Sequence, residues 1–132
     1  MVFISKQVDY GAQFLIALAH QENGEFLSVK EFSKKRNISF LFLQKIVRSL
    51  RAAGFIESSK GAFGGYRLSV DPSAVTLKNI VEAIEGEYQI AACMKVAHEC
   101  PITQNCLSKN SLQKVQVDII SLLEKYSLQS MV

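Results

Sequence analysis

The spacing of hydrophobic residues along the first part of the chain predicts three helices. The first spans about residues 5–20, and the second begins after Ser28, because Ser28 and Glu31 have the spacing of a capping box. The third helix, over residues 39–54, starts at a serine cap and ends at a glycine. The apolar positions expected to face the core are Val8, Phe14, Leu15, Leu18, Val29, Phe32, Leu43, Ile46, Val47 and Leu50.

Two short alternating segments after the third helix predict a β-hairpin. Residues 55–59 and 66–70 alternate in polarity as strands do, and the glycine-rich segment between them, 60–65, indicates the hairpin tip. A nucleotide phosphate loop is excluded for these glycines, because such loops lie between a strand and a helix. A short helix, a turn, a longer helix and a hairpin together predict a winged helix-turn-helix.

Two further helices are predicted in the second half of the chain. One runs from a threonine cap at Thr76 to Gly86. In the other, which begins near Ser111, the apolar residues at helical spacing are Leu112, Val115, Ile119, Leu122, Leu123 and Tyr126. Because the winged helix is already complete, this helix is expected to pair with the same helix of a second chain. Folding back onto the first helix is the alternative.

The expected fold class is therefore mostly α with a small β-hairpin, within one structural unit of 132 residues. Its expected parts are a winged helix-turn-helix over residues 1–86, a cysteine-containing loop over residues 87–110, and a dimerisation helix over residues 111–132. No internal repeat and no low-complexity segment interrupts this order.

Basic residues are concentrated in the predicted helix-turn-helix and hairpin. Between Lys34 and Arg67 there are eight Lys or Arg residues and one acid, Glu57, whereas the whole chain has a net charge of only +3. This clustering favours a nucleic-acid-binding face, since basic side chains neutralise phosphates; a solvated charged surface is the alternative. Lys60, at the hairpin tip, would reach the adjacent minor groove. The residues of the third helix expected to face bases or phosphates of the major groove are Ser39, Phe40, Phe42 and Gln44.

All three cysteines of the chain lie within fourteen residues, at Cys93, Cys100 and Cys106. Thiolates are the ligands that iron–sulfur clusters and soft metals select, so this segment predicts a metal or redox centre. The N-terminal residues show no secretion signal and no apolar run long enough to cross a membrane, so a cytoplasmic protein is expected. In a reducing compartment an odd number of cysteines argues against a disulfide framework. Three unrelated thiols used for packing are the alternative.

An enzymatic role for these cysteines is disfavoured. A cysteine nucleophile needs a base, and His98 is the only histidine near them in the sequence, with no acid–base constellation or substrate loop to accompany it. His98 and the three thiols would also suit a tetrahedral zinc site, although their spacing is not that of a zinc finger. We therefore expect no enzyme activity, no small-molecule substrate and no membrane partner.

Several motifs along nearly the whole chain carry a family resemblance. They run from Val8 to Ala12, from Ser39 to Ile46, from Leu50 to Ile56 and from Ser59 to Leu68, and the three-cysteine segment follows between the last two helices. Together they resemble the IscR/NsrR group of bacterial winged-helix regulators, the Rrf-two family. The resemblance implies a homodimeric regulator that binds double-stranded operator DNA and holds an iron–sulfur cluster, of the 2Fe–2S or 4Fe–4S type, on its three cysteines.

The resemblance also assigns residues. Cys93, Cys100 and Cys106 carry over as cluster ligands, and Ser39, Gln44, Lys45, Lys60 and Gly61 carry over as DNA contacts. With the basic pattern added, the complete set of expected DNA contacts is Ser28, Lys34, Lys35, Ser39, Phe42, Gln44, Lys45, Arg48, Lys60 and Gly61.

The sequence departs from the family's pattern at the cluster ligands. Cys93 and Cys100 are one residue farther apart than in the IscR type, and Lys109 stands where that type has a histidine ligand. Three sources of the fourth ligand stay open: Asp9 donated by the second subunit, His98, or a small molecule, water or nothing from the protein. The expected function is a DNA-binding transcriptional regulator whose operator affinity is controlled by the cluster, in response to cluster supply, iron, nitric oxide or redox state. A cluster-free regulator that uses thiol oxidation or zinc is the alternative.

Overall fold

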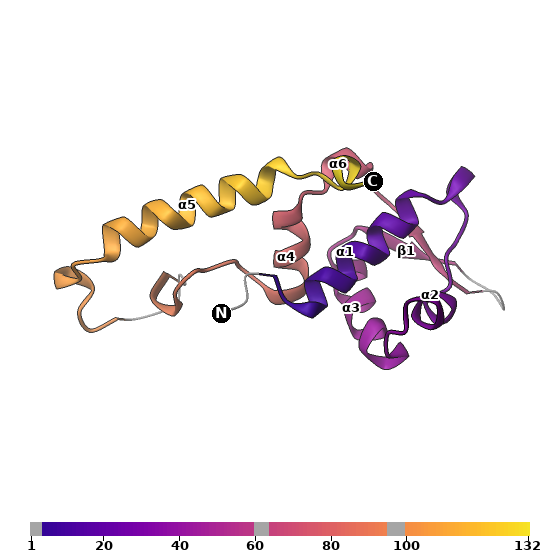
Figure 1. Ribbon diagram of the computed structural model, residues 1–132, viewed down its shortest axis with the longest axis horizontal. Helices are drawn as coiled ribbons and strands as arrows, with labels where there is room; N and C mark the ends of the chain where they lie inside the picture. The colour runs from indigo at the N-terminus through magenta and orange to yellow at the C-terminus, as the bar shows by residue number, and fades with distance from the viewer. Residues whose placement is uncertain (1–3, 60–63, 95–99) are drawn as a thin grey trace.

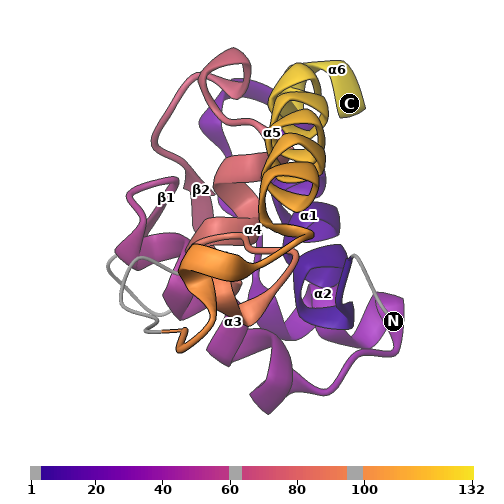
Figure 2. The same cartoon turned by 90° about the vertical axis from the view of Figure 1, so that its left-hand side faces the viewer.

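The computed structural model describes residues 4–59, 64–94 and 100–132, and it confirms a mostly helical fold with a β-hairpin. The first part of the chain forms a body of helices and a hairpin, from which the long helix α5 (Lys109–Lys125) extends away (Figure 1). Figure 2 looks along this long axis with the first turn of α5 towards the viewer, and both views place α3 and α6 on opposite sides of the molecule. Within the described ranges, no helix has the length and apolar character needed to cross a membrane.

The helices of the body begin at side-chain caps. They are α1 (Lys6–Ala19), α2 (Val29–Arg36), α3 (Phe40–Ala52) and α4 (Leu77–Glu85). The hydroxyls of Ser5, Ser28 and Ser39 each accept a hydrogen bond from the backbone N–H three residues ahead, as the sequence predicts. The reciprocal bond that would complete a capping box at Ser28 is not found among the described residues. A complete capping box caps α4 instead, between Thr76 and Asn79.

A tight turn joins α2 to α3 and completes the helix-turn-helix. Asn37 ends α2 in the left-handed conformation, with φ 54°, which asparagine tolerates better than most residues. Ile38 follows and is buried, as is Leu43 one turn into α3, so the two occupy the positions of a hydrophobic staple. The chain is therefore buried both just before α3 and one turn inside it, which fixes the direction in which the helix starts.

The hairpin is the wing, and it is tied to the body by a third backbone segment. β1 (Ile56–Ser58) and β2 (Tyr66–Leu68) pair antiparallel, and the backbone of Leu27 pairs with Tyr66 through N–H···O bonds of 2.8 and 2.9 Å. Next to this pair only glycine fits, because a Cβ on Gly65 would lie 2.8 Å from the Leu27 carbonyl oxygen. The tip over 60–63, with the predicted contacts Lys60 and Gly61, lies outside the described residues.

The end of the chain differs from the single helix predicted over 111–132. α5 stops at Lys125, and a short helix, α6 (Leu128–Met131), packs against α1. The backbone N–H of Leu128 donates to the carbonyl of Val75 at 2.7 Å, and the Leu128 side chain is completely buried. The expectation that the winged helix leaves nothing for the last helix to cover is therefore wrong for the C-terminal end of the chain. There the backbone hydrogen bond to Val75 and the burial of Leu128 hold the chain against the body.

The hydrophobic core lies between α1, α3, α4 and α6. α1 and α4 approach closely at Gly11, where a Cβ would lie 2.5 Å from the Cδ1 atom of Ile84. The largest completely or almost completely buried side chains are Phe14, Leu15, Leu43, Ile46, Leu50, Ile80 and Leu128. Short 3-10 helices span Glu22–Gly24, Pro72–Ala74, Ala92–Met94 and Thr103–Asn105.

Candidate DNA-binding surface and cysteine pocket

One side of α3 packs into the body and the other side is exposed. The buried side consists of Leu43, Ile46, Val47 and Leu50. The exposed positions on the other side include Leu41, Lys45 and Arg48, with Lys34 and Lys35 nearby in sequence at the end of α2. The basic residues predicted to contact DNA therefore have accessible side chains in the described part of the chain.

A shallow groove joins α2, α3 and the wing. Its lining residues are Ser28, Val29, Lys30, Phe40, Gln44, Ser58, Ser59, Gly64, Gly65 and Tyr66. The groove brings together Ser28 and Gln44, two predicted DNA contacts from different helices. It also includes Lys30, which is not among the DNA contacts predicted from the sequence. At the base of the wing the Gly65 backbone N–H donates to the Ser59 hydroxyl at 3.1 Å, which closes the hairpin beside the groove.

The two apolar residues predicted to face DNA at the start of α3 lie in different surroundings, since Phe40 is exposed and lines the groove. Phe42 is half-buried, and its ring packs edge-to-face against Tyr10 of α1 with the ring centroids 5.9 Å apart. Leu41, in contrast, is 76% exposed. Counting back in helical steps from the buried positions of α3 would have placed Leu41 outward and Phe42 inward. The geometry thus favours packing for Phe42 and leaves Leu41 on the outer surface.

Two arginines of the basic region are engaged in contacts within the protein. Arg67 of β2 pairs with Glu57 of β1, with 2.5 Å between Nε and Oε1, and its guanidinium lies over the ring of Phe26 at 4.8 Å. Arg36 lies over the ring of Phe32 at 5.7 Å from the ring centroid. These contacts hold Arg67 along the wing and Arg36 against α2, so the lysines and Arg48 are the better candidates for phosphate contacts.

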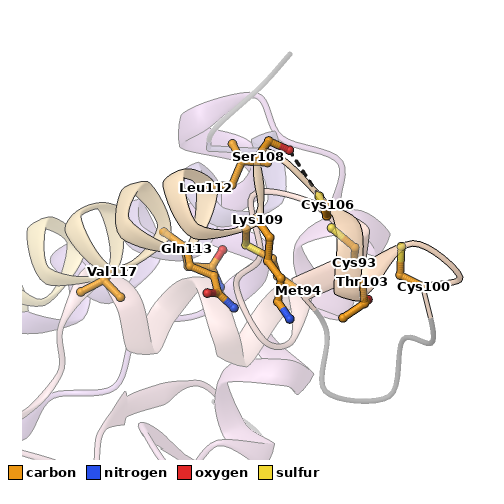
Figure 3. Close-up of a pocket in the computed structure, with 11 residues that line it drawn as sticks. Cys93, Met94, Cys100, Thr103, Cys106, Ser108, Lys109, Leu112, Gln113 and Val117 are labelled. Atoms are coloured by element: carbon orange, nitrogen blue, oxygen red, sulfur yellow. Dashed lines mark hydrogen bonds between the residues drawn. The ribbon is translucent and has the colours of Figure 1, made fainter.

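The three cysteines line one pocket of about 620 Å³ between the 93–106 segment and the start of α5 (Figure 3). Cys93 is exposed, and Cys100 and Cys106 are half-buried. The remaining lining residues are Met94, Thr103, Ser108, Lys109, Leu112, Gln113, Gln116 and Val117. The structure thus brings Cys93, Cys100 and Cys106 to one place, and it adds Lys109, the residue that stands in place of the family's histidine.

Cys106 is the cysteine whose surroundings favour the thiolate. Hydrogen bonding to Ser108 lowers the pKa of the Cys106 thiol, and the positive charge of Lys109 adds to this effect. The Cys106 sulfur and the Ser108 hydroxyl oxygen lie 3.6 Å apart. A thiolate is the form that binds metals and reacts with oxidants, so these surroundings favour the reactive form of Cys106.

The donor set fits a soft metal or an iron–sulfur cluster in its chemistry, because all three side chains are thiols that line one pocket. It is not assembled as a coordination sphere: no three His, Cys, Asp or Glu side chains of the described ranges lie close enough to hold a metal ion. Asp9 is exposed on α1, accepts a hydrogen bond from the Gln13 amide at 3.2 Å, and does not line this pocket. His98 lies outside the described residues.

Gln116 connects the pocket to the segment that follows α4. Its Oε1 atom accepts a hydrogen bond from the Ile90 backbone N–H at 2.8 Å. Its Nε2 atom donates to the Tyr88 carbonyl at 3.3 Å and to Oε1 of Gln89 at 2.5 Å. No sequence pattern indicates this arrangement, since the partners lie 26 to 28 residues earlier in the chain.

Comparison with known proteins places this geometry in a family. The sequence model of the Rrf2 family, described as an iron-dependent transcriptional regulator, matches residues 4–132. The HTH-type transcriptional regulator NsrR of Bacillus subtilis is 28% identical over 130 residues, which covers 98% of this chain and 89% of that protein.

Solved structures agree with the sequence match. CymR (YrzC), the global cysteine regulator of B. subtilis, is similar with a TM-score of 0.77 and 26% identity, covering 99% of this chain and 96% of that chain. T. potens IscR is similar with a TM-score of 0.72 and 25% identity, covering 98% and 85% of the two chains. Since the family match extends over nearly the whole sequence, the chain belongs to the Rrf2 family of transcriptional regulators.

Proposed function

We propose that this protein is a homodimeric repressor whose affinity for operator DNA is controlled by an iron–sulfur cluster held by Cys93, Cys100 and Cys106. The observation that carries the proposal is that all three cysteines line one pocket at the start of α5. DNA binding by a winged helix needs no thiols, so a pocket that gathers every cysteine of the chain supports a separate sensing role.

In this proposal the exposed side of α3 enters the major groove. Leu41, Gln44 and Lys45 share one face of the helix, because residues three and four positions apart lie side by side. Gln44 suits the paired donor and acceptor of adenine, and the apolar surface of Leu41 matches the methyl group of thymine. Lys34, Lys35 and Arg48 neutralise phosphates, which sets the register of the helix but not its sequence preference.

The N-terminus of α2 and the wing are proposed to contact the DNA backbone on either side of the major groove. Ser28 and Lys30 line the groove between α2 and the wing, close to the N-terminus of α2, where backbone N–H groups favour a phosphate. Lys60 and Gly61 at the wing tip are proposed to reach the minor groove, with lysine supplying charge and glycine close backbone approach.

The dimer interface is proposed to be the outer face of α5. Val115, Leu122 and Tyr126 are each about half exposed, and together with Ile119 they form a stripe at helical spacing. A second copy of the chain would cover this stripe, and the two α3 helices would then read half-sites about 34–36 Å apart. A symmetric operator requires such a two-fold arrangement.

The cluster would be held by the three thiolates, with the fourth position filled by Asp9 of the second subunit, by His98 or from outside the protein. When bound, the cluster would be a centre that can be lost, oxidised or nitrosylated. A carboxylate is a hard ligand beside soft thiolates, so an Asp9 position would be the most easily opened. Lys109, which lines the pocket, places a positive charge where an anionic cluster would sit.

A cluster-free thiol switch is the second candidate. It is favoured by the similarity to the cysteine regulator CymR and by the lowered pKa of Cys106. In this version hydrogen peroxide oxidises two of the thiols to a disulfide and is itself reduced to two molecules of water. The altered 93–106 segment would then change operator affinity.

Metal analysis of anaerobically purified protein tests the proposal. Iron with an equal amount of acid-labile sulfide supports the cluster, and zinc supports a structural site. A protein that contains neither iron nor zinc supports the thiol switch. Operators are then selected from a random duplex library, and their affinities are measured with the cluster present and removed. Equal affinities in the two states would contradict cluster control, while failure to select any preferred sequence would contradict the DNA-binding assignment itself.

A further inference from the structure

We propose that Gln116 is the positioning residue through which a change at the cysteines reaches α5. The inference rests on the proposed sensing function of the cysteine pocket. It goes beyond that function by naming the side chain that joins the segment leading to Cys93 to the helix proposed to form the dimer.

The Gln116 amide uses both of its ends. Oε1 accepts from the Ile90 N–H, and Nε2 donates to the Tyr88 carbonyl and to the Gln89 side chain. Because Ile90 offers a donor and Tyr88 an acceptor, only one orientation of the amide satisfies both. The side chain therefore fixes the backbone of residues 88–90 relative to α5.

These bonds lie directly beside the pocket. Ile90 precedes Cys93 by three residues, and both Cys93 and Gln116 line the pocket. A displacement of Cys93 is thus carried along a very short piece of backbone to the atoms that Gln116 holds. Among the described residues, no other side chain of α5 forms a hydrogen bond with the 87–94 segment.

Gln116 also stands on the correct face of α5 to act on the proposed dimer contact. It shares the inner face with Ile120 and Leu123, of which Leu123 is buried. The exposed residues Val115 and Leu122 project from the outer face of the same turns. A rotation or tilt of α5 driven through Gln116 would therefore move the outer face, which a second chain is proposed to cover.

The chain offers a matched control for the test. Gln113 lies one turn earlier on α5, lines the same pocket, and its side chain takes part in none of the hydrogen bonds among described residues. Gln116→Met removes the hydrogen bonds with little change in volume, and Gln113→Met makes the same chemical change without removing them. Gln116→Glu is a second variant, which keeps the acceptor for the Ile90 N–H but loses the donors.

Amide hydrogen exchange of the full-length, cluster-free protein measures the first effect. The Ile90 amide should exchange about 2- to 10-fold faster in Gln116→Met than in the wild type, and at the wild-type rate in Gln113→Met. In Gln116→Glu the increase should be smaller. An unchanged Ile90 rate in Gln116→Met would overturn the proposal. Should Gln116→Met fail to fold, the Ile90 rate is measured in Gln116→Glu, and a wild-type rate there would overturn the proposal.

Coupling to α5 is measured with N-ethylmaleimide, which adds covalently to the thiols and needs no cluster. Alkylation should change the exchange of amides 109–125 in the wild type and in Gln113→Met, and this response should fall about threefold or more in Gln116→Met. A response of wild-type size in Gln116→Met, or no response in the wild type, would overturn the coupling. The folded state alone cannot produce this difference, because each variant is compared with its own unalkylated form.

The same variants separate this inference from the proposed function. If removing the cluster changes wild-type operator affinity, the ratio of the two affinities should fall about threefold or more towards one in Gln116→Met, but not in Gln113→Met. If removing the cluster has no effect in the wild type, cluster control is wrong, and the alkylation experiment still decides whether Gln116 couples the pocket to α5.

Discussion

The winged-helix body and the cysteine pocket are held together by different kinds of contact. The body is organised around completely buried side chains such as Phe14, Leu43 and Ile80, and its helices start at capped ends. Along the described residues of 87–108, no side chain is buried, and polar contacts of Gln116 and Ser108 hold the segment. The difference teaches that the proposed DNA-binding surface is fixed by packing, whereas the segment proposed to sense is held by a few replaceable hydrogen bonds.

The sharpest way to break this comparison is to remove packing from the body. Leu43→Ala should lower the free energy of unfolding by about 2–5 kcal/mol, because it leaves a cavity in a completely buried site. Leu41→Ala, two residues away on the exposed side, should change it by less than about 0.5 kcal/mol while weakening operator binding. Urea denaturation and DNA-binding titrations measure the two quantities. Equal stability losses would contradict the assignment of the two faces of α3.

Removing the thiols should affect sensing and leave the body intact. The triple substitution of Cys93, Cys100 and Cys106 by alanine should abolish cluster absorbance and any response of operator affinity, which in the wild type is expected to be about 5- to 150-fold. The free energy of unfolding should change by less than about 1 kcal/mol, because none of these cysteines is buried. Met94→Leu, in the same pocket, is the control and should keep the response.

Charge on the exposed side of α3 should be visible in the salt dependence of DNA binding. Lys45→Ala should reduce the slope of log affinity against log salt by about one, since one phosphate contact is lost. Arg67→Ala should change the slope less, because Arg67 already pairs with Glu57 along the wing. Titrations at several salt concentrations give both slopes. A larger effect of Arg67 would move the proposed interface from α3 to the wing.

The smallest effect is expected where α4 of the body meets the last turns of α5. Lys78 of α4 pairs with Glu124 of α5 at 3.1 Å, and this hydrogen bond, with the charge of Glu82, raises the pKa of Lys78 above 10.5. The pair therefore contributes its full stability below pH 10.5 and loses it as the pH rises through the raised pKa.

Lys78→Met should accordingly lower the free energy of unfolding near neutral pH by less than about 1 kcal/mol, since Glu124 is half exposed and solvent screens the pair. The difference from wild type should shrink in high salt and above pH 10.5. Lys125→Met, in the last turn of α5 beside Glu124, is the control. A difference that persists unchanged in high salt would show that Lys78 acts through packing of its aliphatic chain.

The body was largely predictable from local signals, and its connections to α5 were not. Ser39 and Gly54 bound α3 because cap chemistry depends only on neighbouring residues. The break after Lys125 depends instead on pairing with the backbone around Val75, fifty residues earlier, which periodicity does not contain.

The candidate sites show the same limit. The cysteines were singled out from their spacing alone, and all three line one pocket. Phe42 was predicted as a DNA contact because it lies near the start of α3, but its packing partner Tyr10 comes from another helix. Gln116 carries no sequence signal, because an amide acquires its role only from the groups that folding places around it.

The return of the chain after α5 has a mechanical consequence. Leu128 anchors the C-terminal end of the helix to the body, while its N-terminal end, beside the cysteines, extends away. The 17 residues of α5 make a rod about 25 Å long. A tilt of about 10° about the anchored end would move the far end by about 4 Å. In the proposed function, chemistry at the cysteines would therefore act at the far end of a lever, where a small force produces a large torque on the winged-helix body.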